Sequence, residues 1–83
     1  MTDDVRRILQ DHARLATDAG TLALEADLYE AGMTSHASVN VMLALEDHFD
    51  LEFPDEMLKP SVFASIAAIT AAVERLQAAQ AAA

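Results

Sequence analysis

Apolar residues recur at helical spacing in the first part of the chain. A stripe begins behind Thr2 and runs to about Thr17, and its members are Val5, Ile8, Leu9, His12, Leu15 and Ala16. Thr2 can cap this helix, with Asp3 and Asp4 in the first turn, where the helix dipole favours negative charge. The pattern therefore predicts an amphipathic helix that ends before Gly20.

A second helical pattern begins at Thr34 or Ser35 and ends near Asp50. One stripe suits the core and consists of Val41, Met42, Leu45 and Phe49. Another flank carries Val39 and Leu43, next to His36, Asn40, Glu46 and Asp47. Two apolar stripes exceed what one buried face needs. Two interpretations are open: a helix buried on two sides of a small bundle, or an exposed face, rimmed by acids, on which a partner docks.

The chain after this helix predicts a short helix and then a longer one. Pro54 stands at a suitable first helical position, with acidic residues behind it, and Pro60 ends this short helix. Ser61 or Ser65 then caps the last helix, whose apolar spacing is given by Phe63, Ile66, Ile69, Val73 and Leu76. The Ala- and Gln-rich tail, residues 77–83, has nothing to bury and is typical of a fraying helix end.

A long connection, residues 18–33, separates the first two helices. Its apolar residues follow no sustained period, and Thr21 is the one position that suits the start of a short helical turn. A loop of this length is usually functional or packed by its own side chains, so we expect its apolar residues to lie beneath the helices. No stretch alternates with period two. The predicted fold is all-α, with three longer helices and one short one in a single domain over residues 1–83.

Charge restricts the classes of partner. The formal net charge is −9, and no Lys or Arg occurs from Leu15 to Leu58. Nucleic acid would be repelled, whereas a basic protein surface would be attracted; an acidic surface that implies no partner is the alternative. The chain has no Cys, which excludes disulfides and thiolate zinc sites. It has no secretory signal and no apolar run of membrane-spanning length, so we expect a cytoplasmic protein without membrane contact.

The residue pattern offers little catalytic chemistry. His36 and His48 are too far apart on one helix to share a metal ion, and no HExxH spacing occurs, so we expect no metal site. His12 lies on the core stripe and is better explained as a packed, hydrogen-bonded histidine. A nucleophile elbow around Ser35 is missing, and the adjacent His36 points about 100° around the helix from it. We therefore expect no enzyme activity.

Ser35 is nevertheless the residue that the pattern singles out. It follows Gly32, Met33 and Thr34 at the start of the second helix. Free backbone N–H groups and the positive end of the helix dipole suit an attached phosphodiester at such a position. An N-cap role for Ser35 or Thr34 explains the same residues and is the commoner case. The local pattern leaves both interpretations open.

Further pieces of the chain match a known pattern in order along nearly the full length. They are Asp27-Leu28, Gly32-Met33-Thr34-Ser35, Val39-x-x-Met42-Leu43-Ala44-Leu45-Glu46, Phe49-Asp50-Leu51, Phe53-Pro54-Asp55 and Phe63-x-Ser65-Ile66-x-x-Ile69. Together these pieces resemble the acyl carrier protein family. The resemblance implies a four-helix bundle with a long first loop and a short third helix. It also implies that Ser35 carries 4′-phosphopantetheine, moved from coenzyme A by a Mg²⁺-dependent phosphopantetheinyl transferase, and that the terminal thiol of this arm holds cargo as a thioester.

Departures from the family pattern lie around the serine. The usual Asp-Ser-Leu is replaced by Thr34-Ser35-His36, and the next turn is neutral where fatty-acid carriers are commonly acidic. The resemblance then implies a docking face that relies less on salt bridges and more on apolar contact. We expect it to consist of Thr34, His36, Val39, Asn40, Leu43, Glu46 and Asp47.

The run from Ala26 to Val39 is most similar to the bacterial aminoacyl carrier proteins. This likeness implies loading with a small amino acid, glycine or alanine, by a seryl-tRNA-synthetase-like amino acid:carrier-protein ligase that uses ATP. The downstream acceptor enzyme is unknown, and we expect the carrier to be a monomer. Two alternatives stay open: a specialised fatty-acyl or polyketide acyl carrier protein, and an unmodified acidic helical interaction module in which Ser35 is only a cap.

Overall fold

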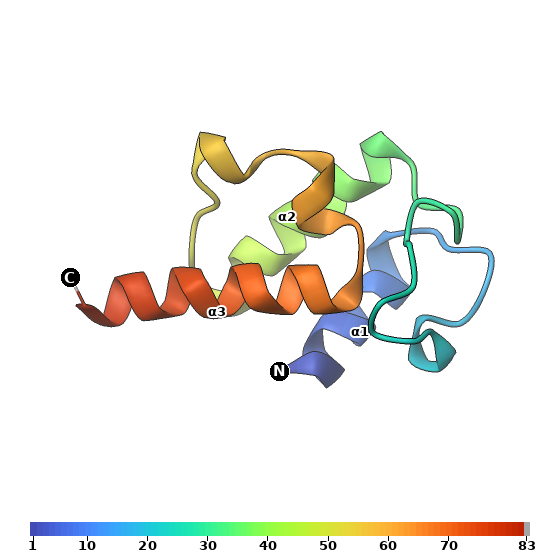
Figure 1. Ribbon diagram of the computed structural model, residues 1–83, viewed down its shortest axis with the longest axis horizontal. Helices are drawn as coiled ribbons and strands as arrows, with labels where there is room; N and C mark the ends of the chain where they lie inside the picture. Colours follow the sequence, from blue (N-terminus) through green and yellow to red (C-terminus); the bar gives the residue numbers. More distant parts are fainter. Residues whose placement is uncertain (83) are drawn as a thin grey trace.

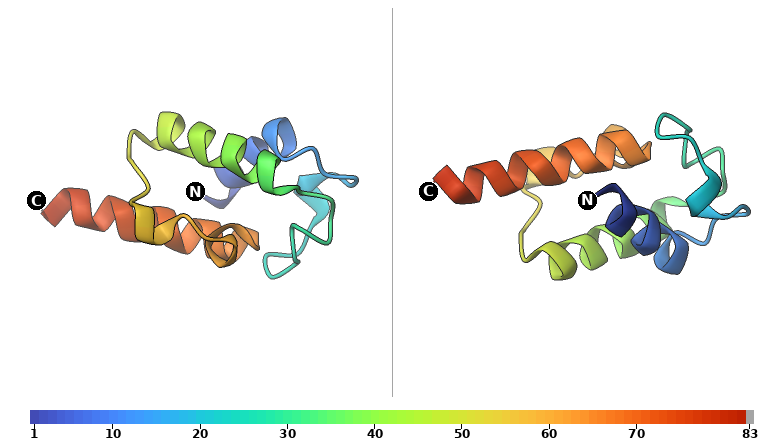
Figure 2. Two further views of the ribbon diagram at one scale, coloured as in Figure 1. Left: turned by 90° about the horizontal axis from the view of Figure 1, so that it is seen from above. Right: turned by 90° about the horizontal axis from the view of Figure 1, so that it is seen from below.

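Three α-helices enclose one apolar core in the computed structural model, which describes residues 1–82 (Figure 1). They are α1 (Thr2–His12), α2 (Ser35–Phe49) and α3 (Ile66–Ala82), and the 3₁₀ turns between them are η1 (Ala19–Thr21), η2 (Asp55–Met57) and η3 (Pro60–Phe63). No strand occurs in this part of the chain. α1 packs against both α2 and α3 (Figure 2). The all-α prediction is confirmed.

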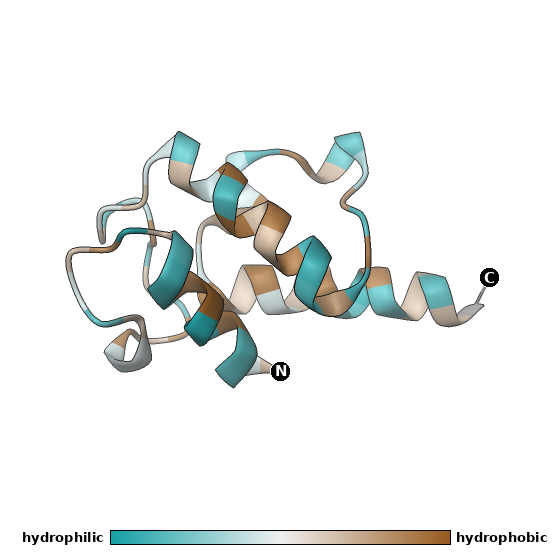
Figure 3. Ribbon diagram, turned by 180° about the vertical axis from the view of Figure 1, so that it is seen from behind, coloured by the Kyte–Doolittle hydropathy of each residue, from teal (hydrophilic) through white to brown (hydrophobic). Residues whose placement is uncertain are grey.

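The core takes its largest side chains from all three helices and from the long loop. Those that are fully buried are Val5, Leu9, Leu28, Val41, Leu45, Ile66, Ile69 and Val73. Figure 3 shows apolar and polar residues mixed along α1 and α2, and the residues of α1 that are buried in the core are Val5, Ile8 and Leu9. Met42 and Phe49 are half-buried against this core. The predicted core stripe of α2 is therefore confirmed, although only Val41 and Leu45 are fully covered.

The first helix ends earlier than its apolar pattern predicts. α1 stops at His12, and Arg14 adopts φ 55°, which turns the chain away from the helix axis. The N–H of Ala16 donates to the carbonyl of Ala31 at 3.1 Å, so the chain pairs with the end of the loop where we expected a further helical turn to Thr17. His12 is exposed at this helix end. Both the extension to Thr17 and the packed His12 were wrong predictions.

The start of α1 also differs from the prediction in one respect. Thr2 is already helical, and Met1 occupies the cap position without a side-chain hydrogen bond. Asp3 and Asp4 do lie in the first turn, as the pattern predicts.

Two polar side chains of α1 hold the long loop. Arg6 Nη1 donates to the carbonyls of Ala19 and Leu22, at 2.8 and 2.7 Å. The N–H of Ala19 in turn donates to Gln10 Oε1 at 2.9 Å. The sequence had indicated Thr21 as the start of a short turn, but Thr21 is the last residue of η1. α1 therefore binds the core with one face and the loop with another.

The loop is also joined to the start of α3. The N–H of Leu28 donates to the carbonyl of Ala64 at 2.7 Å, and the N–H of Ala67 donates to the carbonyl of Leu24 at 3.0 Å. Leu28 and Met33 are buried beneath the helices as expected, whereas Leu24 is 45% exposed. The loop is thus packed by its own side chains and fixed at both ends.

The segment predicted as a short third helix forms two separate turns. Pro54 is the cap residue of η2 and not its first helical residue, and Pro60 begins η3 where we expected it only to end a helix. The Ser65 hydroxyl accepts a hydrogen bond from the N–H of Ala68 at 3.0 Å, which confirms Ser65 as the cap of α3.

The last helix continues through most of the tail. α3 runs to Ala82, and Gln80 Nε2 donates to the carbonyl of Asp50 at 3.0 Å, which links the tail to the end of α2. Residue 83, the last of the tail that we expected to fray, lies outside the described residues. No helix within residues 1–82 has the length and apolar character needed to cross a membrane.

The contact between Arg6 and the loop can be tested by Arg6→Met, which keeps an apolar side chain of similar length but removes both donated hydrogen bonds. Hydrogen bonds that involve a charged group contribute about 1.5–3 kcal/mol, and we expect a loss of about this size in the free energy of unfolding, measured with urea. Arg7→Met is the matched control, because Arg7 is exposed on the same helix, and it should change stability by less than about 0.5 kcal/mol. Equal losses of stability in the two variants would contradict a stabilising role for the hydrogen bonds from Arg6 to the loop.

Candidate functional site

The start of α2 is set by a turn that only glycine accommodates well. Gly32 has φ 117°, and a Cβ added there would meet the backbone nitrogen of Ala16 at 3.3 Å. A side chain at this position would be both strained and crowded. The turn brings the chain from the loop into α2 next to the end of α1.

Thr34 and Ser35 divide the roles that the sequence left open. Thr34 is extended (φ −86°, ψ 166°) and is the N-cap of α2, since its Oγ1 accepts a hydrogen bond from the N–H of Ala37 at 3.0 Å. Ser35 is the first helical residue and is exposed. Its hydroxyl forms no hydrogen bond within residues 1–82, and only its backbone carbonyl is engaged, by Ser38 Oγ at 2.6 Å. The cap is therefore Thr34, and the Ser35 hydroxyl is available for another purpose.

The electrostatics of this helix end favour an anion. The first turn of α2 contains no acidic residue, so the positive end of the helix dipole is not neutralised by a neighbouring carboxylate. The N–H groups that open a helix have no intrahelical partner, and the Thr34 side chain accounts for only one of them. A negatively charged group attached near Ser35 would be stabilised by these groups.

A hollow of about 400 Å³ lies beside Ser35. One wall consists of α2 residues, and the opposite wall comes from the segment that contains η2 and η3. The lining residues are Tyr29, Ser35, Ser38, Val39, Met42, Leu58, Lys59, Pro60 and Phe63. Phe63 is held in place by Phe53, with ring centroids 5.4 Å apart. The site therefore combines a free hydroxyl, a helix N-terminus and a largely apolar cavity.

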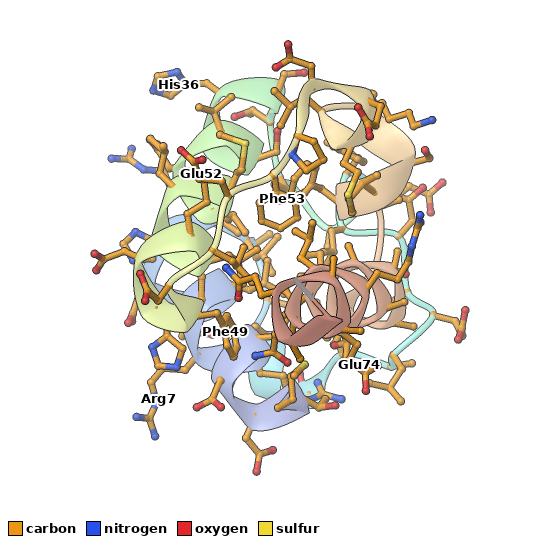
Figure 4. All side chains as sticks on the ribbon, turned by 90° about the vertical axis from the view of Figure 1, so that its left-hand side faces the viewer. Arg7, His36, Phe49, Glu52, Phe53 and Glu74 are labelled. Carbon is orange, nitrogen blue, oxygen red and sulfur yellow. The ribbon has the colours of Figure 1, made fainter. Side chains whose placement is uncertain are left out.

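The second flank of α2 is exposed and not buried. Val39 and Leu43 are 50% and 52% exposed, so the interpretation of α2 as buried on two sides is wrong. His36 points away from the core at the start of α2 (Figure 4). Asn40 is half-buried and Asp47 is exposed. The expected docking residues thus lie around two exposed apolar side chains.

Glu46 has a structural contact that sequence reasoning missed. Its Oε2 accepts a hydrogen bond from the N–H of Phe53 at 2.9 Å. Asp50 ends α2 with φ 53°, and the N–H of Leu51 donates to the carbonyl of Glu46 at 3.1 Å. Glu46 therefore holds the chain where it leaves the helix. No sequence signal distinguishes this acid from the exposed acids around it.

Of the described residues, Lys59 is the one charged residue that lines the hollow beside Ser35, and the other charged groups lie elsewhere. His48 Nε2 lies 3.6 Å from Asp4 Oδ1 in an exposed contact between α2 and α1. Within residues 1–82 no three His, Asp or Glu side chains are grouped so that they could hold a metal ion.

Comparison with known proteins gives a family. Residues 3–73 match the family model described as phosphopantetheine attachment site. An aminoacyl carrier protein of Agrobacterium fabrum is 51% identical over 69 residues, which cover 83% of this chain and 83% of that protein.

Solved structures agree with this match. One is an engineered Bradyrhizobium japonicum glycine:[carrier protein] ligase complexed with a carrier protein from Agrobacterium tumefaciens and AMP; the similarity has a TM-score of 0.87 and 49% identity, and covers 89% of this chain and 99% of that chain. Another is the Bradyrhizobium japonicum ligase complexed with glycylated carrier protein, with a TM-score of 0.73, 25% identity, and coverage of 86% and 95%. The resemblance seen in the sequence is confirmed: the chain belongs to the phosphopantetheine attachment family of carrier proteins.

Proposed function

We propose that Ser35 carries a 4′-phosphopantetheine arm and that the chain holds a small amino acid, glycine or alanine, as a thioester on it. The observation that carries this proposal is the division of roles at the start of α2. Thr34 caps the helix, which leaves the Ser35 hydroxyl exposed and, among the described residues, without a hydrogen-bond partner. The family match and the glycylated carrier in a related structure support both the arm and the cargo.

The chain's own residues would bind and present the arm. The open first turn of α2 stabilises the negative charge at the attachment point, and the absence of an acid there avoids repulsion. When attached, the arm supplies a terminal thiol, a group that a chain without Cys otherwise lacks. Within residues 1–82 no base is hydrogen-bonded to the Ser35 hydroxyl, and we propose that modification and loading are carried out by other proteins and that this chain is not an enzyme.

The partners follow from the relatives. We propose a phosphopantetheinyl transferase that uses coenzyme A, and an ATP-dependent, seryl-tRNA-synthetase-like ligase that loads the amino acid. The complexes of related carriers with glycine:[carrier protein] ligase support the second partner. The acceptor that takes the cargo is a further enzyme. We also propose that the protein acts in the cytoplasm, as expected from its sequence.

Docking would use the exposed flank of α2. Val39 and Leu43 supply the apolar centre, and the residues around them are Thr34, His36, Asn40, Glu46 and Asp47. The hydrogen bond of Glu46 to Phe53 gives this residue a second task, since it also orients the end of the docking helix. Apolar contacts at the centre of an interface usually contribute more than charges at its rim.

We take η2 and η3 together as the counterpart of the family's short third helix, which would make the fold a four-helix carrier bundle. We also propose that residues 1–83 form one carrier domain and that it acts as a monomer.

Ser35→Ala should abolish attachment of the arm. Wild-type protein incubated with coenzyme A, Mg²⁺ and a phosphopantetheinyl transferase should gain the mass of one arm, measured on the intact protein, and the variant should gain none. Because Thr34 and not Ser35 caps α2, we expect the stability of the variant to change by less than about 0.5 kcal/mol. Ser38→Ala, one turn further along the same helix, is the control and should accept the arm. A wild-type protein that gains no mass would show that the site is not an attachment point.

Loading distinguishes the aminoacyl carrier from the acyl carrier alternative. The arm-bearing protein should become glycylated or alanylated when ATP, the amino acid and a glycine:[carrier protein] ligase are present, as followed by intact mass. Malonyl and fatty-acyl donors with their own transferases should load it poorly. Efficient acylation together with no aminoacylation would favour the fatty-acyl or polyketide carrier.

Val39→Asp or Leu43→Asp should weaken loading and leave the fold intact. Either substitution would place an unpaired charge in the apolar centre of the interface, which costs more than loss of the apolar contact alone; at about 1 kcal/mol or more, kcat/KM for loading should fall at least about fivefold. Leu24→Asp is the matched control, because Leu24 is also about half exposed but belongs to the loop, where its carbonyl is bound by the start of α3. Equal effects of all three substitutions would contradict a docking face on α2, and unfolding of the α2 variants would show that this flank is core.

A further inference from the structure

Lys59 is the one charged side chain among the residues that line the hollow beside Ser35. It is also the first cationic residue after a long acidic stretch, since no Lys or Arg occurs from Leu15 to Leu58. Lys59 belongs to the segment between η2 and η3, whereas Ser35 belongs to α2. The hollow therefore has the N-terminus of α2 on one wall and its one charged residue, Lys59, on the other.

The two turns on either side of Lys59 determine where its backbone lies. The N–H of Leu58 donates to the carbonyl of Asp55 at 3.1 Å and closes the turn η2. Lys59 itself is extended (φ −140°, ψ 153°), and a residue before proline, here Pro60, is restricted to this region. Its carbonyl then accepts from the N–H of Val62 at 3.1 Å as η3 begins. Two consecutive turns thus hold the lysine at a defined place opposite α2.

The ammonium group of Lys59 is not used by the fold. Within residues 1–82 the one ion pair is that between His48 and Asp4, and Lys59 is exposed. An exposed lysine that no carboxylate engages is free to bind an anion brought by something else. The walls around it are mainly apolar side chains such as Val39, Met42 and Leu58, which screen an ion pair less than open water does.

We propose that Lys59 is a positioning residue for the arm: its ammonium binds the phosphodiester of the arm attached to Ser35 and thereby holds the first part of the arm across the hollow. This inference rests on the proposed attachment at Ser35. A phosphodiester carries one negative charge, and a lysine on its flexible four-carbon stem binds phosphate as a point charge. The N-terminus of α2 and Lys59 would then flank the same anion from two walls of one cavity.

The experiment is ³¹P NMR of the arm-bearing protein, with complete modification first established by intact mass. In the wild type the phosphodiester signal should differ from that of a small pantetheine phosphodiester and should move towards it as salt is raised, because salt screens exposed charges over about 10 Å at 0.1 M. Lys59→Gln should give a signal close to the small-molecule value with little salt dependence. Lys59→Arg, which keeps the charge, should restore the wild-type behaviour.

Arg75→Gln is the matched control. It removes the same charge from an exposed cation on α3 that does not line the hollow, so its ³¹P signal should follow the wild type. Amide spectra of the unmodified variants check that each is folded. Attachment of the arm to the wild type should change the amide chemical shifts of Val39 and Lys59. In Lys59→Gln, attachment should change the amide chemical shift of Val39 by a smaller amount.

The possible failures are distinguishable. A wild-type protein that takes up no arm overturns the attachment at Ser35, and the role of Lys59 with it. A protein that carries the arm but shows the same ³¹P signal and salt dependence in Lys59→Gln as in the wild type overturns the role of Lys59 alone. If Lys59→Gln accepts the arm too poorly to be measured, the wild type alone decides: a ³¹P signal that does not move with salt overturns the role of Lys59.

Discussion

The hydrogen bond from the N–H of Ala37 to Thr34 Oγ1, 3.0 Å long, is the interaction on which the site depends. A helix that begins with two hydroxyl residues has two possible caps, and the choice decides which hydroxyl is free. Here the extended backbone of Thr34 places it as the cap, and Ser35 enters the helix with its hydroxyl exposed. The β-branched Thr is stiff at χ1, so this choice is held by the side chain itself as well as by the preceding turn.

The position of the turn at Gly32 depends on the hydrogen bonds that hold the loop. The pairing of Ala16 with Ala31 and that of Leu28 with Ala64 bind the loop to the end of α1 and to the start of α3. Arg6 adds a third anchor at the other end of the loop. The domain thus positions Ser35 largely through backbone hydrogen bonds, which a loop of irregular sequence can supply without a regular apolar pattern.

The sequence predicted what depends on periodicity and missed what depends on distant backbone groups. The bounds of α2 followed from apolar spacing and hydroxyl placement, and the structure confirms them; for the cap of α3 the sequence offered Ser61 or Ser65, and the structure selects Ser65. The early end of α1 did not, because the apolar stripe continues to Leu15 and Ala16 while the competing partner, the carbonyl of Ala31, is remote in sequence. The exposed flank at Val39 and Leu43 could be named but not placed, since apolar residues alone do not show whether a third element covers them. The sequence did not indicate that Lys59 belongs to the site, because only folding brings it to the cavity next to Ser35.

The distribution of charge along α2 places the residues that would attract a partner apart from those that would select it. The first turn, next to Ser35, has no acid, and the carboxylate of Glu46 is committed to the backbone of Phe53. The free negative charge of the helix therefore lies at its far end, from Asp47 onwards. Long-range attraction of a basic partner would act there, because electrostatic steering needs no close fit. Contact near the arm would instead depend on the shape and apolar character of His36, Val39 and Leu43, so a partner suited to acidic carriers would be attracted to this chain without matching the surface next to Ser35.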